Sequence, residues 1–391
     1  MQNTFIGKNP SVLWFLLGLS VFTVVVTLCS EALGADIIST SFLKTLGKTL
    51  CLCLVAIAMD VVWGYCGILS LGHFAFFGIG GYAIGMWLMY ARTEDIVVAS
   101  LQNATLPPTP DEVTTAIGSQ IFGVVGSSDF PMIWALSHSL TLQLLAVVLV
   151  PGLLALVFGW LAFRSRVTGV YLSILTQAMT LALSLYFFQN DTGLRGNNGL
   201  SGLQNVPGLE AVSQATLSLW FFWGSAFALG AGYVLFAWIV SGKLGSVIRA
   251  IRDNEARVRF LGYHVESYKL FVFTVTAMVA GIAGALYYPQ AGIINPAEIA
   301  PIASIYLAVW VAIGGRGRLY GAVIGAAVVS LMSSWFTGGA APDINLGFYV
   351  VQWTDWWLVL LGLTFVVVTL FFPKGIGGVF DLIAKRKGDT A

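Results

Sequence analysis

The sequence has little charge. Among its 391 residues there are 19 Lys and Arg and 18 Asp and Glu, or 9% charged, against about 25% in ordinary globular domains. The net charge of +1 gives no indication of a nucleic-acid partner, and we expect none. Hydrophobic residues make up 58%, and the 44 glycines suit close helix packing in a bilayer. This composition predicts an all-α polytopic membrane protein.

The residues that usually carry catalysis or bind metal are also scarce. Cys51 and Cys53 are one residue apart, which is not a zinc spacing, and we expect no metal site. No HExxH motif or nucleophile–base set occurs, so we expect no enzyme. The single Gly-Lys-Thr, at 47–49, has Phe42 in place of the upstream glycine of a phosphate loop. We therefore expect no cofactor in this chain.

Apolar segments of roughly 20 residues predict membrane-spanning helices. Residues 11–30 fit either a signal peptide or a first span, and the single basic residue before them, Lys8, favours a span. Residues 302–315 are short, so they form either a broken crossing or a re-entrant segment. The ten candidate spans are 11–30, 46–66, 70–90, 139–162, 168–188, 217–240, 270–290, 302–315, 319–336 and 355–372.

The basic residues orient these spans. If the N-terminus is cytoplasmic and all ten segments cross, 15 Lys and Arg lie inside and four outside, in agreement with the positive-inside rule. We therefore expect both termini in the cytoplasm and one membrane-spanning domain over 1–391. The outer loops, about 91–138 and 190–208, are rich in polar residues, Pro or Gly, which predicts irregular turns.

The longest inner loop, about 241–269, gathers nine charged residues between Lys243 and Lys269. Ile248, Ile251, Val258 and Leu261 recur at helical spacing, which predicts one amphipathic helix over 245–261 that stops at Gly262. Two charge pairs, Asp253 with Arg257 and Glu255 with Arg259, have the i, i+4 spacing that supports an exposed helix. Such a helix is either a solvated or headgroup-bound element or a protein-docking element.

Two glycine-rich segments, 64–85 and 314–325, have low helix propensity. In a membrane they indicate either close helix packing or a midplane pathway whose backbone faces a cavity. His73 lies in the first segment, where a structural hydrogen-bonding role competes with a proton-relay role. Asp60 is the one carboxylate within an apolar span, for which capping or snorkelling competes with a transport role.

Four long motifs follow one another along most of the chain after residue 50: VVWGYCGILSLGHFAFFGIGGY (61–82), RSRVTGVYLSILTQAMTL (164–181), AIRDNEARVRFLGYHVESYKLFVFTVTAMVAGIAGALY (250–287) and VWVAIGGRGRLYGAVIGA (309–326). In this order they resemble the permease subunits of LIV-type ABC importers, a family that carries branched-chain amino acids and, in one branch, urea. Where relatives usually read GGRGTLxGPxxGA, this chain has Arg318 and Ala322, so the resemblance does not extend to the local pore geometry at these positions.

The resemblance implies a non-catalytic permease in a bacterial plasma (inner) membrane. Its partners would be a second homologous permease subunit, two cytoplasmic ATP-binding subunits and a periplasmic or lipid-anchored substrate-binding protein, within membrane lipid. ATP would be bound by the partners alone, and alternating access would follow their closure. The residues that the resemblance places in the ATPase-coupling helix are Arg252, Asp253, Asn254, Glu255, Arg257 and Gly262.

Finer features resemble the larger urea permease subunit: NDTGLRGNNGLSG at 190–202, the insertion after residue 90 and YYPQAGIINPAEIAP at 287–301. The alternatives are the same machine carrying branched-chain amino acids and a self-sufficient secondary transporter or channel. For urea we expect backbone carbonyls freed by the glycine-rich breaks to serve as partners. The candidate pathway residues are Gly72, His73, Gly78, Gln177, Asn197, Asn198, Gly314 and Gly315.

Overall fold

The apolar segments form helices because a backbone in hydrocarbon has to satisfy its own N–H and C=O groups. A computed structural model describes residues 9–32, 39–101, 109–122, 132–338, 344–345, 350–371 and 375–378. In this part of the chain eight helices are long and apolar enough to span a membrane, and two shorter apolar helices accompany them. Each of the ten predicted spans falls on one of these helices. The protein is all-α and polytopic.

The orientation of the spans stays a prediction, and the basic residues at 8 and 385–387 lie outside the described residues.

The longer helices are α2 (Pro10–Ala32), α3 (Thr40–Asp60), α4 (His73–Leu101), α5 (Pro110–Phe122), α6 (Leu140–Arg164), α7 (Val170–Phe188), α8 (Gln214–Ser241), α9 (Lys243–Asp253), α10 (Glu255–Phe260), α11 (Val265–Ala291), α12 (Pro301–Gly314), α13 (Leu319–Thr337) and α14 (Trp353–Phe371). The short elements are the π-helix η1 (Val61–Tyr65), the 3₁₀ turns η2 (Met132–Trp134), η3 (Asn190–Thr192), η4 (Gly196–Asn198) and η5 (Pro296–Ile299), and the strands β1 (Leu200–Ser201), β2 (Ile293–Ile294), β3 (Ile344–Asn345) and β4 (Val350–Val351).

Contacts divide the chain into two units, each assembled from separate sequence segments. Unit 1 consists of Met1–Leu69, Phe222–Val272 and Ile305–Ala391, and unit 2 of Ser70–Phe221 and Phe273–Ser304. The boundaries fall inside α8, α11 and α12, so these three helices contribute residues to both units. One permease domain over 1–391 stays a prediction.

Unit 1 is built on α3, which is buried without interruption from Thr49 to Asp60. α13 packs along it, and the Thr49 and Ser330 hydroxyls lie 3.1 Å apart. On α2, Phe15 stacks on Tyr233 of α8 with ring centroids 3.8 Å apart. α14 closes this unit through a buried cluster of α12, α13 and α14 side chains, namely Ile313, Val329, Trp357, Leu361 and Val368.

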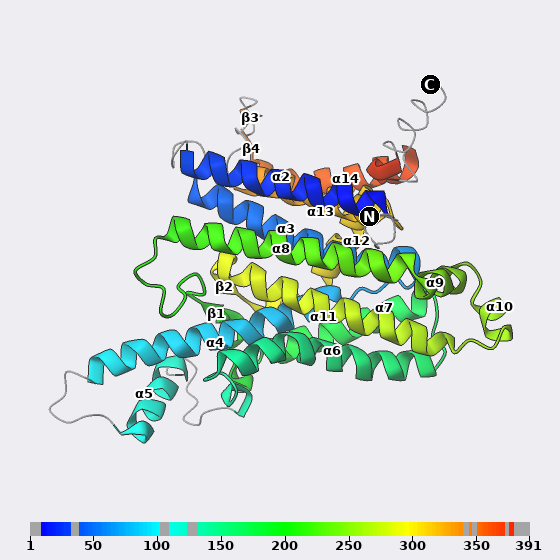
Figure 1. The fold of residues 1–391 in the computed structure, drawn as a ribbon. Coiled ribbons are helices and arrows are strands. Elements are labelled where there is room, and N and C mark those ends of the chain that lie inside the picture. The colour runs from blue at the N-terminus through cyan, green and yellow to red at the C-terminus, as the bar shows by residue number, and fades with distance from the viewer. Residues whose placement is uncertain are drawn as a thin grey trace. The chain divides into compact units, whose positions relative to one another are not determined.

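Unit 2 is organised around α4, which packs along α6 and against α5 and α7 (Figure 1). Small residues permit close contacts with the α11 segment of this unit: a Cβ on Gly80 would meet the Gly281 backbone, and one on Gly81 would meet the Tyr288 ring. β1 pairs antiparallel with β2, with Leu200 opposite Ile294. Glycine in the first glycine-rich segment therefore serves close packing, one of the two roles that its pattern indicates.

The prediction of irregular structure over 91–138 is wrong for two parts of that loop. α4 continues to Leu101, and α5 begins at Pro110. Thr109 caps α5: Glu112 N donates to Thr109 Oγ1 over 3.4 Å, and Thr109 N donates to Glu112 Oε2 over 2.9 Å. This reciprocal capping box starts a helix directly after the prolines. The 190–208 loop is turn-rich as predicted, with positive φ at Gly193, Gly196, Gly199, Gly202 and Gly208.

Candidate functional site

The charged loop of unit 1 forms two helices, α9 and α10, where we predicted one. The break falls at Asn254, whose φ of −159° and ψ of 94° are extended. Its side chain accepts a hydrogen bond from Arg257 N over 3.0 Å and so caps the N-terminus of α10. An N-cap residue needs non-helical backbone angles, and this requirement ends α9 one residue earlier. Gly262 follows α10 with a φ of +86°, the left-handed C-terminal position predicted for it.

An apolar stripe packs the two helices against each other and against the start of α11. Ile251 and Val258 are buried in one cluster with Val265, and Ile248 is buried as well. Leu261 departs from this stripe, because it lies after the end of α10 and is 71% exposed. Three of the four predicted stripe residues therefore serve burial.

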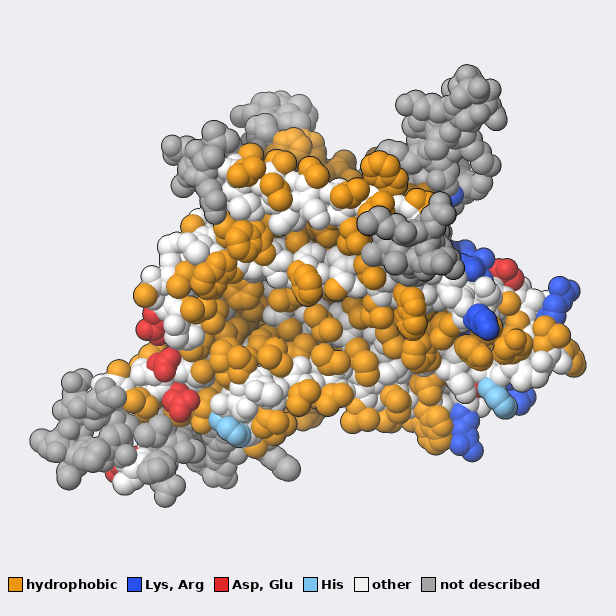
Figure 2. All heavy atoms as spheres, viewed as in Figure 1, with side chains coloured by type: hydrophobic (Ala, Val, Ile, Leu, Met, Phe, Trp, Pro, Cys, Tyr) orange, Lys and Arg blue, Asp and Glu red, His pale blue; other side chains and the backbone are white. Residues whose placement is uncertain are grey.

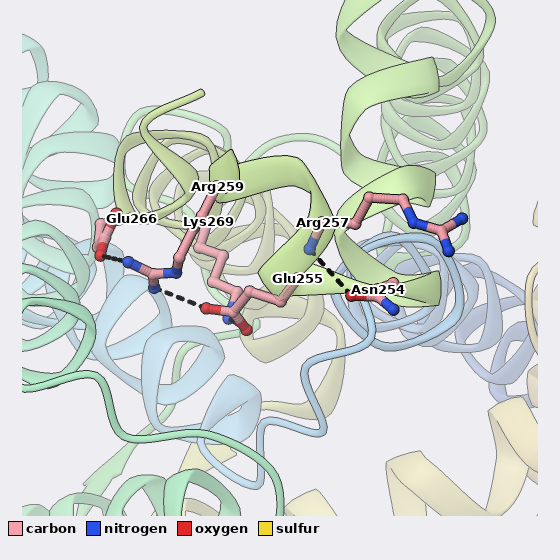
Figure 3. Close-up of polar contacts among 6 residues, drawn as sticks. All are labelled: Asn254, Glu255, Arg257, Arg259, Glu266 and Lys269. Carbon is pink, nitrogen blue, oxygen red and sulfur yellow. Dashed lines mark hydrogen bonds and ion pairs between the residues drawn. The ribbon is translucent and has the colours of Figure 1, made fainter. Parts of the chain in front are cut away.

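An ion-pair network anchors α10 to the first turns of α11 (Figure 3). Glu255 receives Arg259 Nη2 at 2.7 Å on one carboxylate oxygen and Lys269 Nζ at 2.6 Å on the other. The same guanidinium pairs with Glu266 through Nη1. The predicted Glu255–Arg259 pair is confirmed. The predicted Asp253–Arg257 pair is wrong, because the break at Asn254 separates the two helices and Asp253 pairs with Arg252 at 3.0 Å.

The network sets the charge state of its members. Partial burial of Glu255 favours its neutral form, but hydrogen bonds and attraction from Lys269 and Arg259 outweigh burial and lower its pKa. Hydrogen bonds from Glu255 and Glu266 raise the pKa of Arg259. The Lys269 side chain is only 7% exposed, so its ammonium depends on Glu255 for compensation. This part of the segment is a fixed structural anchor.

The remaining side chains of the segment face solvent. Phe260 is 92% exposed, and its neighbour Leu261 is exposed too. Asp253 and Arg257 are exposed, and Figure 3 shows the Arg257 side chain directed away from the ion-pair network. Lys and Arg side chains gather over α9 and α10 in Figure 2. The segment thus combines a buried anchor with an exposed surface that carries aromatic, aliphatic and charged groups.

In unit 2, the structure brings Gly72 against α7, the helix that carries Gln177, and His73 against Thr276 of α11. A Cβ on Gly72 would lie 3.0 Å from Met179 Cε. His73 is buried, with Nδ1 3.1 Å from Ser70 Oγ and Nε2 3.3 Å from Thr276 Oγ1. Both ring nitrogens therefore have hydroxyl partners, as a structural histidine requires.

The other candidate pathway residues of unit 2 differ in exposure. Gly78 is buried, and a Cβ there would meet the Ile299 side chain of η5. Gln177 is half-buried on α7. Asn197 and Asn198 are exposed in η4. The structure thus gives Gly78 a close-packing role and leaves the pathway assignment of these residues a prediction.

In unit 1, the pair at Gly314 and Gly315 ends α12 and packs tightly. A Cβ on Gly314 would meet the carbonyl of Gly321 and the amide of Gly325, so α12 and α13 touch through their backbones. Gly315 has a φ of +112°, which L side chains rarely adopt. Both glycines are accounted for by helix contact and chain reversal, and a pathway role for them stays a prediction.

Two backbone carbonyls in or beside the first glycine-rich segment have side-chain donors. In unit 2, Leu71 N donates to Thr176 Oγ1 over 3.0 Å, and Leu71 O accepts from Thr180 Oγ1 over 3.2 Å. In unit 1, Gly64 O accepts from Arg252 Nη1 over 2.8 Å. These two carbonyls are engaged by side chains, and the expectation that carbonyls at the glycine-rich breaks serve a solute stays a prediction.

Sequence reasoning missed a second polar contact of unit 1, between Asp60 and the α12–α13 turn. The Asp60 carboxylate is buried and accepts from Gly317 N over 2.7 Å. The lone carboxylate in an apolar segment was the signal for it, but its partner lies 257 residues away. Arg259, Glu266 and Lys269 were likewise absent from the predicted coupling residues, although they complete the network around Glu255.

Comparison with known proteins places this geometry in a family. Residues 41–369 match the family described as branched-chain amino acid transport system / permease component. The chain belongs to this family. Its segment between α8 and α11, with the anchored α10, is therefore a feature of a transport permease, and the four motifs that resembled this family all lie within the matched residues.

Individual relatives agree with the family at low identity. The permease protein LivM of the high-affinity branched-chain amino acid transport system of Escherichia coli is 25% identical over 65% of this chain and 61% of its own length. A probable branched-chain amino acid transport permease protein LivM of Methanocaldococcus jannaschii is 21% identical over 83% of this chain and 89% of its own. The ribose import permease protein RbsC of Haemophilus influenzae is 23% identical over 48% and 58%.

The chain spans less than two thirds of the length of E. coli LivM. No solved structure matches it.

Proposed function

We propose that this chain is the non-catalytic transmembrane subunit of an ATP-driven importer in a bacterial inner membrane, and that its cargo is urea. It pairs with a second homologous permease subunit, and a substrate-binding protein delivers the solute on the outer side. Two ATP-binding subunits dock on α9 and α10 and supply the energy. The observation that carries this proposal is the anchored, solvent-facing α9–α10 segment in a chain of the permease family.

The docking surface in this proposal consists of Asp253, Arg257, Phe260 and Leu261. Aromatic and arginine side chains are enriched at the energetic centres of protein interfaces, and Phe260 is fully presented for such a contact. The exposed charges of Asp253 and Arg257, which belong to different helices, set the register on the partner. The ion-pair network behind them keeps α10 from yielding when the partner moves. Closure of the two ATP-binding subunits then shifts the membrane helices between outward- and inward-facing states.

Urea as the cargo is supported by the motifs at 190–202 and 287–301 and by the chemistry around His73. Urea is neutral, with several hydrogen-bond donors and one strong acceptor. The surroundings of His73 in unit 2 are hydroxyl-rich, with Ser70 and Thr276 on its ring and Thr176 and Thr180 at Leu71. α7 carries no charged residue. In this proposal the pathway runs beside these buried hydroxyl groups, whose chemistry suits an uncharged polar solute.

Branched-chain amino acids are the second candidate cargo, because relatives in E. coli and M. jannaschii are described as branched-chain amino acid transport permeases. Such zwitterions need donors for a carboxylate, and exposed helix N-termini provide them. Both cargoes use the same docking and the same conformational cycle.

Solute uptake into proteoliposomes tests the proposal. The chain is reconstituted alone and together with its candidate permease partner, ATP-binding subunits and binding protein, and labelled urea and leucine are offered with and without ATP. We expect urea to accumulate only with all partners and ATP. Accumulation of leucine alone keeps the importer and replaces the cargo. Flux through the isolated chain without ATP contradicts the ABC assignment and leaves α9–α10 a solvated element.

A further inference from the structure

α3 does not end as a regular helix. Its last residues continue into the π-helix Val61–Tyr65, in which Cys66 N donates to Val61 O over 3.2 Å. Ile68 N then donates to Val62 O over 3.0 Å, the carbonyl six residues earlier, whereas a regular α-helix would bond it to the carbonyl four residues earlier. The Gly64 carbonyl, which an α-helix would have bonded to Ile68 N, therefore loses its main-chain donor. π-helical turns of this kind are frequent at functional sites.

Arg252, near the end of α9, supplies the missing donor. Its Nη1 lies 2.8 Å from Gly64 O, across 188 residues of sequence. The α9 backbone itself approaches the same turn: a Cβ on Gly67 would lie 2.9 Å from Arg252 Cγ and 3.3 Å from Arg252 Cα. Gly67 has a φ of +78°, so the turn depends on glycine twice, for its backbone angle and for this contact. α9 therefore both touches and hydrogen-bonds the end of α3.

A second contact leads from the same place to α13. Asp60, the last residue of α3, accepts from Gly317 N over 2.7 Å, and Gly317 lies in the turn that precedes α13. Gly64 lies between the two, since a Cβ there would meet both Asp60 Oδ1 and Gly317 N. A buried carboxylate is costly, and this one is retained where three segments of unit 1 meet.

We propose that Arg252, Gly64, Asp60 and Gly317 form a joint that transmits displacement of α9 to α3 and α13. Arg252 is then a positioning residue that acts inside the subunit, whereas the resemblance placed it among the residues of the coupling helix. The proposal deepens the proposed function and rests on it, because the displacement is the one that the ATP-binding subunits impose on α9–α10.

The helices beyond the joint are suited to carry the displacement. α3 is buried without interruption from Thr49 to Asp60, and α13 packs along it. A close-packed helix pair moves as a rod, because its interior cannot deform continuously. A shift of the Gly64 carbonyl by Arg252 is therefore passed to α3 and, through Asp60, to the start of α13.

The test compares Arg252→Met and Arg252→Lys with Arg249→Met. Arg249 is a matched control on the same helix. Its Nη1 also donates to a backbone carbonyl of another helix, that of Val240 in α8, over 3.2 Å. In the full complex in proteoliposomes, transported solute per ATP hydrolysed is measured together with affinity for the ATP-binding subunits. We expect Arg252→Met to lower the transport-to-hydrolysis ratio about tenfold, Arg252→Lys to restore part of it, and Arg249→Met to stay within about twofold.

A second measurement does not depend on transport. Amide hydrogen exchange of the full chain in nanodiscs follows residues 61–69 and 315–319 in the same three variants. We expect Arg252→Met to speed exchange in both segments about tenfold or more, the effect of one lost hydrogen bond to a charged donor, while Arg249→Met leaves both unchanged.

The outcomes separate the two proposals. If Arg252→Met weakens binding of the ATP-binding subunits and leaves the transport-to-hydrolysis ratio normal, Arg252 is a docking residue and the joint is wrong. If exchange in 61–69 rises but exchange in 315–319 and the transport ratio do not change, the contact is structural and transmits nothing. If the wild-type complex shows no ATP-driven transport, the proposed function fails, and unchanged exchange in 315–319 would refute the joint independently.

Discussion

Lys269 Nζ lies 2.6 Å from Glu255 Oε2, so that a nearly buried lysine on α11 is compensated by the first residue of α10. This pair makes the position of α10 depend on one carboxylate. Removing that carboxylate leaves an ammonium and a guanidinium without their shared partner, which is more costly than the loss of a surface ion pair.

Glu255→Gln is therefore expected to loosen α10 by about 2 kcal/mol, the range for a hydrogen bond to a charged group. Amide exchange of α10 in the full chain measures this as faster exchange, by more than tenfold. Glu210→Gln, an exposed carboxylate, is the control and should change nothing. Equal exchange in both variants would show that the apolar cluster around Val258 holds α10 without the network.

The pH dependence of α10 follows from the lowered pKa of Glu255. A carboxyl group whose folded pKa is lowered contributes stability that is complete above its ordinary value of about 4.3 and is lost as the pH falls through the folded pKa. We expect the protection factor of α10, which is the exchange rate corrected for the intrinsic pH dependence of amide exchange, to fall in the wild-type chain as the pH drops below that ordinary value. The same loss of protection should be absent from Glu255→Gln, and an identical pH profile in that variant would assign the effect to another carboxyl group.

Asn254→Ala is expected to destabilise α10 by about 1 kcal/mol, because the amide of Arg257 loses its capping oxygen. Asn254→Asp keeps an oxygen in the same place and should remain close to the wild type. Amide exchange at Arg257 and Val258 reports the difference. If Asn254→Ala instead joins α9 and α10 into one helix and slows exchange, the break is set by the cap alone.

Gly314→Ala is expected to destabilise the α12–α13 contact by about 1–3 kcal/mol, since the added methyl group overpacks the backbone of Gly321. Gly18→Ala in α2 is the matched control, because nothing lies within 4 Å of its Cβ position. It should be neutral or stabilising by up to about 1 kcal/mol through helix propensity. Thermal unfolding in the same detergent measures both, and equal midpoints would contradict the close backbone contact.

Phe260→Ser tests the docking surface of the proposed function. Because Phe260 is 92% exposed, its replacement should leave unfolding unchanged. Binding of the ATP-binding subunits should weaken about tenfold or more, as for an interfacial aromatic anchor. Unchanged binding would show that α10 is not part of the interface. Val258→Ser, which disrupts the buried cluster, serves as a comparison variant with a folding defect.

Hydropathy was sufficient to place the ten apolar helices, because a spanning segment has to be apolar along its whole length. The Glu255–Arg259 ion pair could be predicted from the sequence as well, because residues four positions apart on one helix lie side by side. The break at Asn254 was missed because an Asn inside a helical pattern is read as a helix residue until its backbone angles are known. Thr109 and Glu112 carried a capping box that the proline-rich surroundings concealed.

The contacts of the joint could not be predicted from local sequence patterns. Arg252 was assigned to the coupling helix by resemblance, but its bond to Gly64 spans 188 residues. Periodicity describes which side of a helix is apolar and says nothing about which distant carbonyl a guanidinium reaches. The candidate pathway residues show the same limit of local patterns. Glycine density was consistent with close helix packing and with a transport pathway, and the structure shows packing partners for Gly72, Gly78 and Gly314.

The separation of Asp60 from Gly317 also bears on how the chain is made. The ion pairs of α10 connect residues at most 14 positions apart, so they can close while the segment is still leaving the ribosome. Asp60 enters the bilayer early in synthesis, and its amide partner is translated 257 residues later. The contact between the end of α3 and the turn before α13 can therefore form only after most of the chain has been synthesised.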